Sequence, residues 1–164
     1  MKKHLFGITL MLSALLISGM ASAQFTDIDD IQAYDTAGAP ASPLDGTVVT
    51  VAGNIYVVKG TYNNGSHYIA DATGGITFFD SGATLNIGDY VEITGTVGSY
   101  SGEIQLGGLT YANAAPGTEP APVVLTPEEC LTSYENVGSF VSVIGTIVDY
   151  TGGSTFGLAG ADST

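Results

Sequence analysis

The stretch from Gly46 to Val58, GTVVTVAGNIYVV, alternates apolar with small or polar residues. Its apolar positions on one face are Val49, Val51 and Ile55. Such alternation is typical of a half-buried β-strand. Gly53 interrupts the apolar face, where a glycine commonly marks a bend or a bulge. We therefore predict a long first strand that is bent at a glycine, as suits a small closed barrel.

Four more strand patterns follow, separated by short turns. We expect strands at residues 66–71, 75–80, 90–100 and 103–111, with Asn63–Gly65 as a hairpin signal because Asn and Gly tolerate positive φ. The expected interior also includes Ile69, Val91, Ile93, Val97, Ile104 and Leu106. The pattern predicts an all-β fold, a five-stranded Greek-key barrel of the OB-fold kind over residues 46–112, with a loop between its third and fourth strands. An SH3-like barrel or a fragment of a β-sandwich is the alternative.

Two segments flank this barrel. In the lead segment, residues 24–45, we expect a short helix with Thr26 as its N-cap, Asp29 at the capping-box position, and Ile28 and Ile31 on its buried side. Residues 113–125 contain three prolines and no apolar period, and they predict an extended linker.

The first strand is repeated ninety-two positions later as GSFVSVIGTIVDY, Gly138–Tyr150. Five of the thirteen positions are identical and two more exchange Thr for Ser. Before this copy, Thr126 and Pro127 fit the N-cap and first position of a short helix, with Glu129 completing a capping box. Residues 126–164 therefore predict a helix and the start of a second, incomplete copy. Because two strands cannot close a barrel, we expect either that the reading frame continues beyond Thr164 or that these strands pack against the first barrel.

Residues 1–23 have the form of a secretory signal. Lys2 and Lys3 precede an apolar stretch, and Ala21-Ser22-Ala23 provides small residues at a cleavage site. We expect cleavage near Ala23 and a protein secreted to the periplasm or outside the cell. The apolar stretch is too short to span a membrane, and no later run approaches the ~20 residues required.

Charge and cysteine content limit the partners and the covalent structure. After residue 23, Lys59 is the only Lys or Arg, against sixteen Asp and Glu residues. This balance disfavours partners that are rich in phosphate. Cys130 is the only cysteine, so we expect no internal disulfide, and we expect its thiol to be buried rather than reactive.

Three motifs suggest a wider relationship: YIAD-x-TGGI at residues 68–76, GD-x-V-x-ITGTV at 88–97 and G-x-IQL at 102–106. With these motifs, residues 27–148 resemble the OB-fold modules in the N-terminal parts of bacterial secreted nucleases and related surface proteins. The resemblance implies a non-catalytic accessory module. It also implies that its partner is a metal-dependent nuclease or phosphoesterase domain downstream in the same protein.

The OB-fold interpretation also predicts a binding face. OB-folds commonly bind ligands across their second and third strands and the adjacent loops, by aromatic stacking within a basic groove. The candidate binding residues are Lys59, Tyr62, Asn63, Asn64, Tyr68, Thr77, Phe79 and Tyr100. Single-stranded nucleic acid and oligosaccharide are the candidate ligands, but Lys59 alone cannot supply the counterion release on which nucleic-acid binding depends. The aromatic residues could equally be ordinary strand-forming positions.

No catalytic, metal or cofactor site is predicted. His67 alternates with Ile69, and its counterpart in the second copy is Phe156, so we expect it in the core or at the barrel rim. No nucleophile–His–acid set and no G-x-S-x-G motif surrounds it. The acidic run Asp27–Asp30 lacks the Gly and the final Glu of a calcium loop. Its position at a helix start is explained by the helix dipole.

Overall fold

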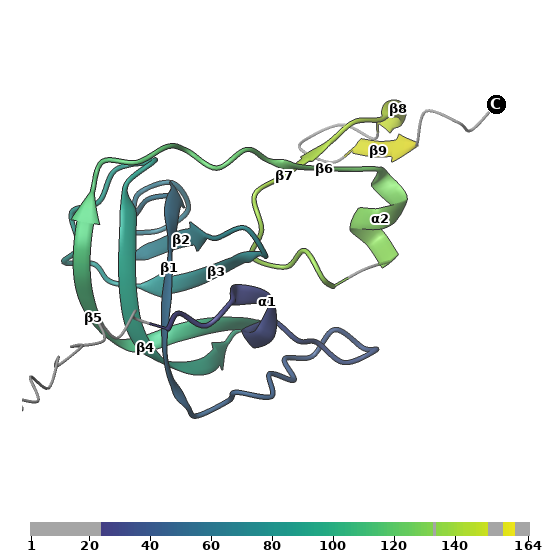
Figure 1. Ribbon diagram of the computed structural model, residues 1–164. Coiled ribbons are helices and arrows are strands. Elements are labelled where there is room, and N and C mark those ends of the chain that lie inside the picture. Colours follow the sequence, from purple (N-terminus) through teal and green to yellow (C-terminus); the bar gives the residue numbers. More distant parts are fainter. Residues whose placement is uncertain (1–23, 133, 151–155, 160–164) are drawn as a thin grey trace, which may run out of the picture.

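The computed structural model describes residues 24–132, 134–150 and 156–159 (Figure 1). The predicted secretory signal therefore lies outside the described residues. Five strands form the main sheet: β1 (Val48–Val57), β2 (Ser66–Ala70), β3 (Gly75–Phe79), β4 (Tyr90–Tyr100) and β5 (Glu103–Ala115). They confirm the predicted all-β class and the predicted strand positions. In the part of the chain described, no helix is long and apolar enough to cross a membrane.

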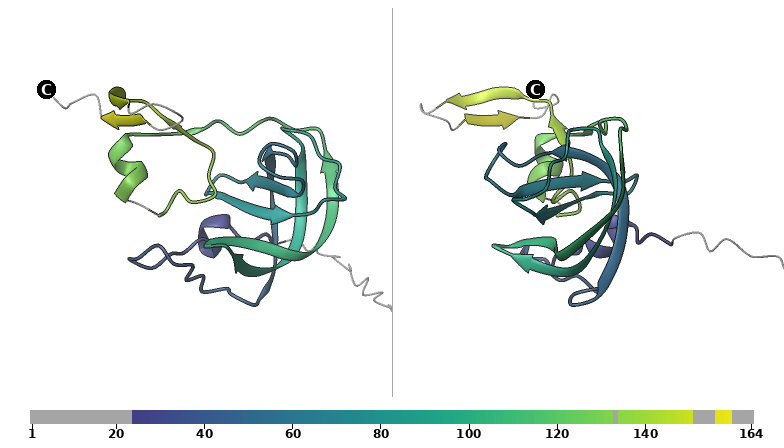
Figure 2. Two further views of the ribbon diagram at one scale, coloured as in Figure 1. Left: turned by 180° about the vertical axis from the view of Figure 1, so that it is seen from behind. Right: turned by 90° about the vertical axis from the view of Figure 1, so that its left-hand side faces the viewer.

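The five strands close on themselves in the order β1-β2-β3-β5-β4, with β4 returning to β1. All neighbouring pairs are antiparallel except β3 and β5, which run parallel. The view from behind in Figure 2 shows the ring of strands, with the hairpin of β8 and β9 to one side. The parallel pair decides the position of the site described below, because it brings the start of β5 beside β3.

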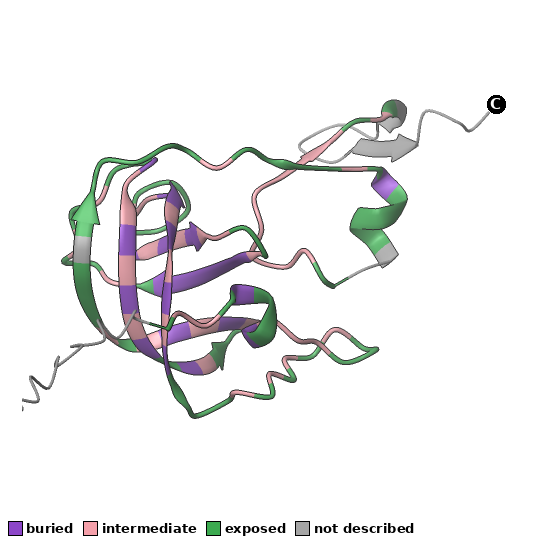
Figure 3. Cartoon of the chain, in the orientation of Figure 1, coloured by how far each residue is buried: buried purple, intermediate pink, exposed green. Residues whose placement is uncertain are grey.

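Side chains that alternate along the strands fill the ring. The expected interior residues are all buried: Val49, Val51, Ile55, Ile69, Val91, Ile93, Val97, Ile104 and Leu106. Figure 3 shows buried segments along all five strands. Phe78 and Ile76 on β3 complete the core. Period-two burial therefore holds as predicted from the sequence.

Gly53 lies next to the point at which the pairing of β1 changes from β4 to β2. The strand pairs with β4 as far as Asn54 and with β2 from Asn54 onward. A Cβ at Gly53 would overlap the carbonyl oxygen of Ala70 on β2. A glycine is thus needed here for the close approach of two backbones.

The lead segment packs against the ring through helix α1 (Ile28–Ile31), whose two isoleucines are fully buried in the core. The predicted cap is wrong, because the N-cap is Asp27 and its side chain makes no cap hydrogen bond. Instead, the N–H of Ile28 donates to Asp71 Oδ2 at 2.9 Å, in the β2–β3 turn. A tertiary acceptor therefore replaces the expected local one.

The predicted linker at residues 113–125 is shorter than expected. β5 continues to Ala115 because that residue still pairs with Tyr90 on β4. At the other end, Val123–Leu125 form β6 and pair in parallel with β7 (Val141–Val143). Strand structure enters the predicted linker at both ends for the same reason. In each case a strand distant in sequence provides hydrogen-bonding partners, although the stretch itself has no apolar period.

Helix α2 (Pro127–Thr132) begins as predicted. The Glu129 carboxylate accepts the N–H of Thr126 at 2.7 Å, and the Thr126 hydroxyl accepts the N–H of Glu129 at 3.3 Å. These reciprocal bonds are a capping box. The burial predicted for Cys130 is wrong, because this residue lies exposed on α2. The neighbouring Leu131 is exposed as well.

The second copy of the long strand is divided in two. Its halves are β7 and β8 (Thr146–Tyr150), and β8 pairs with β9 (Phe156–Ala159). Residues 134–140 pack against the first barrel: the Tyr56 hydroxyl donates to the carbonyl of Gly138, and its ring stacks on Phe140 with centroids 5.5 Å apart. Contact with the first barrel is therefore made by residues 134–140. For the copied strands themselves, packing against the first barrel and a reading frame that continues beyond Thr164 both stay predictions.

Candidate ligand-binding groove

A groove of about 690 Å³ lies over β2, β3 and the turn that joins β4 to β5. We call it the β2–β3–β5 groove. Its lining residues are Asn63, Ser66, Tyr68, Thr77, Phe79, Tyr100, Ser101, Glu103 and Gln105. Its volume falls in the range of small-molecule sites, about 300–1,000 Å³.

Strand pairing brings these side chains together. Tyr68 on β2 lies opposite Thr77 on β3, and Thr77 lies beside Gln105 on the parallel strand β5. Because side chains alternate, these residues face the groove while Phe78 and Leu106 face the core. The sheet therefore presents a row of polar and aromatic groups over an apolar interior.

A tight turn supplies the third wall. Ser101 and Gly102 join β4 to β5 with φ of 54° and 87°. Two successive residues of positive φ are typical of a two-residue hairpin loop. This turn places Tyr100 at the rim of the groove, where the residue is 74% exposed. Phe79 is also exposed, and its ring lies over Gly65 so closely that a Cβ there would overlap it.

Glu103 is the only ionisable carboxylate among the residues that line the groove. The Tyr68 hydroxyl donates to Glu103 Oε2 at 3.3 Å. Burial raises the pKa of Glu103, and the hydrogen bond from Tyr68 opposes that rise. Burial and the nearby carboxylate together raise the pKa of Tyr68. The groove thus combines hydrogen-bond acceptors and donors with a weak negative charge.

Of the eight predicted residues, five line the groove: Asn63, Tyr68, Thr77, Phe79 and Tyr100. Tyr62 borders it, with its ring edge against Tyr68 and centroids 6.2 Å apart. Thr77 is buried at the floor and donates to the carbonyl of His67. Lys59 and Asn64 do not line the groove, and Lys59 Nζ instead donates to the carbonyl of Ser81 at 2.9 Å.

Sequence reasoning missed four lining residues: Ser66, Ser101, Glu103 and Gln105. Glu103 and Gln105 alternate with the predicted interior residues of the fifth strand, so the sequence already indicated that their side chains point outward. The alternation does not predict that β3 pairs in parallel with β5, and this pairing is what places the two residues close to Thr77.

His67 is fully buried and is held by backbone groups. Its Nδ1 accepts the N–H of Lys59 at 3.3 Å, and its Nε2 lies 3.1 Å from the carbonyl oxygen of Asp80. This arrangement requires a neutral ring with its proton on Nε2. The ring stacks on Phe78, and burial lowers its pKa. His67 is a core residue, as its alternation indicated.

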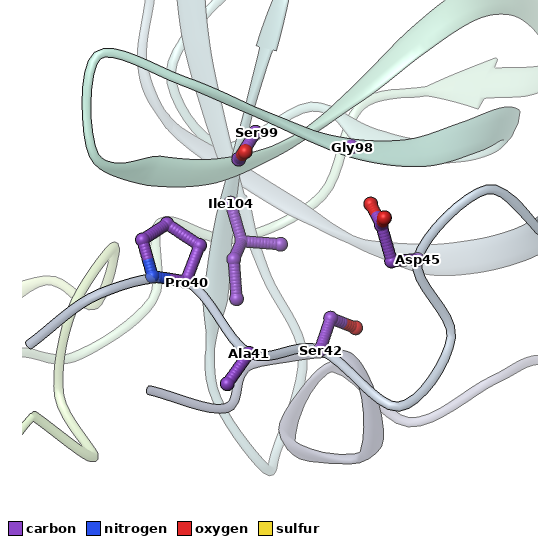
Figure 4. Close-up of a pocket in the computed structure, with 7 residues that line it drawn as sticks. All are labelled: Pro40, Ala41, Ser42, Asp45, Gly98, Ser99 and Ile104. Carbon is purple, nitrogen blue, oxygen red and sulfur yellow. The ribbon is translucent and has the colours of Figure 1, made fainter. Parts of the chain in front are cut away.

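Two other features are less suited to a ligand. A hollow of about 250 Å³ lies where the lead loop meets β4 and β5, with Asp45 as the one carboxylate among its lining residues (Figure 4). Asp27, Asp29 and Asp30 bring their carboxylates within 4.8 Å of one another, but all three are exposed. Such exposed acidic groups repel each other and are solvated, and they do not by themselves make a metal site.

No protein-family model, no curated protein and no solved structure matches this chain. The geometry and chemistry of the β2–β3–β5 groove are therefore the basis for a function.

Proposed function

We propose that this chain is a non-catalytic OB-fold accessory module of an exported protein, and that its β2–β3–β5 groove binds an oligosaccharide. The observation that carries the proposal is the composition of the groove. Exposed aromatic rings, hydroxyls, amides and one carboxylate line it, and no Lys or Arg is among them.

The strand order supports the OB-fold. β1 pairs with both β2 and β4, and the parallel pairing of β3 with β5 completes a five-stranded ring. An OB-fold is a five-stranded Greek-key barrel, and its second and third strands with the adjacent loops bind oligonucleotides or oligosaccharides. The location of the groove over β2 and β3 fits this proposal.

The charge of the groove favours a sugar over a nucleic acid. Phosphate binding depends on cations, and the only described Lys or Arg side chain, that of Lys59, is bonded to Ser81 outside the groove. A sugar needs no cation, because its apolar ring face packs on Phe79 or Tyr100 while its hydroxyls bond Glu103 and Gln105. Single-stranded nucleic acid is the second candidate, since the same rings could stack on bases.

The carboxylates argue for binding without hydrolysis. Most glycoside hydrolases use two carboxyl groups about 5–9.5 Å apart on either side of the scissile bond. Among the described residues that line the groove, Glu103 is the only Asp or Glu. The accessory role in a larger exported protein, with a nuclease-like domain downstream, rests on the signal-like residues 1–23 and on the resemblance of the barrel motifs.

Glycan-array screening followed by calorimetry tests the proposal. We expect saturable binding of an oligosaccharide that Phe79→Ala and Tyr100→Ala each weaken by about tenfold, because truncating an aromatic side chain on which a ligand packs typically costs more than ~1 kcal/mol. Ile87→Ala is the matched control, since Ile87 is also exposed but lies outside the groove. A labelled single-stranded oligonucleotide at low salt should not bind. Oligonucleotide binding that both aromatic substitutions weaken would instead favour the second candidate.

A further inference from the structure

The second copy reproduces the hairpin of the first in its backbone register. An offset of ninety-two residues relates β8 to the second half of β1. The first hairpin pairs Ile55 with Ile69 and Val57 with Tyr68, and the second pairs Ile147 with Leu158 and Asp149 with Gly157. In both, the register shifts between these two pairs. The repeat therefore extends to an irregularity in the same place.

The lead segments also occupy equivalent positions. In the first copy, the N–H of Thr26 donates to the carbonyl of Thr50 on β1 at 2.8 Å. In the second, the N–H of Val123 donates to the carbonyl of Phe140 at 2.8 Å, and β6 continues along β7. The counterpart of Thr50 is Ser142 on β7. β6 thus lies along one edge of β7, and the corresponding edge of β1 is the one that Thr26 contacts.

The opposite edge of β1 carries β4. There Val49 pairs with Gly95 and Val51 with Ile93, and the carbonyl of Thr47 accepts the N–H of Val97 at 2.9 Å. Backbone groups of successive residues in a strand point to opposite edges, so the odd-numbered residues of β1 bond to β4 and the even-numbered ones face the other way.

The counterparts of Val49 and Val51 are Val141 and Val143 on β7. By the same alternation, their N–H and C=O groups point away from β6. Within the described residues, β7 pairs with β6 alone. Ile144, which directly follows β7, is 68% exposed. We call the row of backbone groups at Val141 and Val143 the open edge of β7.

We propose that the open edge of β7 binds an antiparallel β-strand of the β4 type, supplied by a polypeptide segment other than β4 itself. Its chemistry follows from the first copy, where β4 reads YVEITGTV over residues 90–97, with Ile93 opposite Val51 and Gly95 opposite Val49. The partner is therefore an extended segment with β-branched residues at alternate positions and a glycine opposite Val141. Main-chain hydrogen bonds supply the affinity of such strand addition, and the alternation supplies its register.

The experiment adds the peptide YVEITGTV to the full chain and measures amide exchange residue by residue. We expect the amides of Val141 and Val143 to exchange fast without peptide and to be protected at least about tenfold when it is bound. The peptide YVEPTGTV should not protect them, because proline in place of Ile93 removes a ladder donor.

Substitutions in the protein locate the contact. Val141→Pro removes an N–H that faces the peptide, and edge positions tolerate proline, so we expect about tenfold weaker binding. Ser142→Ala is the matched control, since it removes no backbone group and should leave binding unchanged. The amide of Ser142 faces β6, and its protection reports whether the β6–β7 pair persists. If Val141→Pro abolishes that protection, Val143→Pro serves for the comparison.

Three results would overturn the proposal. The first is slow exchange of Val141 and Val143 in the dilute protein without peptide, which would mean that the edge is already occupied. The second is unchanged peptide affinity in a proline variant whose Ser142 amide is still protected. The third is a concentration-dependent dimer that Val141→Pro dissociates, without peptide binding, which would assign the edge to a second copy of this chain.

Discussion

At the scale of single residues, the environment of His67 makes stability depend on pH. Burial lowers the pKa of the folded histidine below its ordinary value of 6.5. Between the lowered pKa and 6.5 the unfolded chain binds more protons than the folded one, so stability falls as pH falls. The slope cannot exceed about 1.4 kcal/mol per pH unit.

This prediction is tested by denaturant titration from pH 7.5 down to pH 5. We expect His67→Phe to remove most of the slope between pH 7 and pH 5.5. Glu103 acts in the opposite sense, because its raised pKa stabilises the fold at low pH and loses that contribution as pH rises through the folded pKa. The comparison is therefore made in a Glu103→Gln background. An equal slope in the histidine variant would contradict the neutral, buried assignment.

A second residue-scale prediction concerns Gly53. In Gly53→Ala the added methyl group would overlap the carbonyl oxygen of Ala70, and a backbone atom cannot move aside as a flexible side chain can. We expect a loss of unfolding free energy of about 2 kcal/mol or more. Gly98→Ala, on β4, is the control because its Cβ would meet no atom within 4 Å. Equal stability of the two variants would be evidence against the close approach of β1 and β2.

At the scale of elements, the strands best predicted from the sequence are those with one buried face, because burial of that face requires apolar residues at alternate positions. β4 spans the predicted residues 90–100 because one face is buried along most of its length. The cap of α1 and the ends of the linker were not predictable in this way. Ile28 is capped by Asp71, forty-three residues away, and β6 exists because β7 lies beside it. Local patterns carry no information on such partners.

The division of the second long strand has the same kind of cause. β1 stays continuous through Gly53 because β4 holds its first part and β2 its second, with Asn54 shared by both. The corresponding strand has β6 along its first part and β9 along its second, and no described strand pairs across Gly145. The repeated sequence is therefore compatible with one strand or with two, and the neighbours decide which one forms.

An element-scale prediction concerns how residues 134–140 attach to β3. A Cβ at Gly75 would overlap the carbonyl oxygen of Gly138 and would lie 2.8 Å from the Tyr56 hydroxyl oxygen. We expect Gly75→Ala to separate this segment from the barrel, and Tyr56→Phe to weaken the attachment less because the stacking on Phe140 remains.

Limited proteolysis and amide exchange measure this attachment. Cleavage within residues 134–140 should become at least several-fold faster in Gly75→Ala, while the amides of β4 keep their protection. Gly107→Ala, where a Cβ would meet nothing within 4 Å, is the matched control. Unchanged cleavage in Gly75→Ala would mean that the contact between Gly75 and Gly138 does not hold the segment.

At the scale of the whole molecule, the barrel core depends on residues outside the five strands. Ile28 and Ile31 come from the lead segment, yet both are fully buried among the side chains of the ring. The hydroxyl of Tyr34 accepts the N–H of Ile104 at 3.0 Å, which ties the same segment to β5. The stable unit therefore comprises residues 24–115 rather than the strands alone.

The last prediction follows from this boundary. A fragment of residues 24–115 should show a cooperative thermal unfolding transition. A fragment of residues 46–115 should show no such transition, because it should already be unfolded at 25 °C. Small barrels without disulfides have little stability to lose, and removing one buried isoleucine typically costs about 2–5 kcal/mol. Ile28→Ala and Ile31→Ala in the longer fragment test the same point without truncation, with the exposed Ile87→Ala as control. If residues 46–115 melted as residues 24–115 do, α1 would be an attachment to the barrel and not a part of its core.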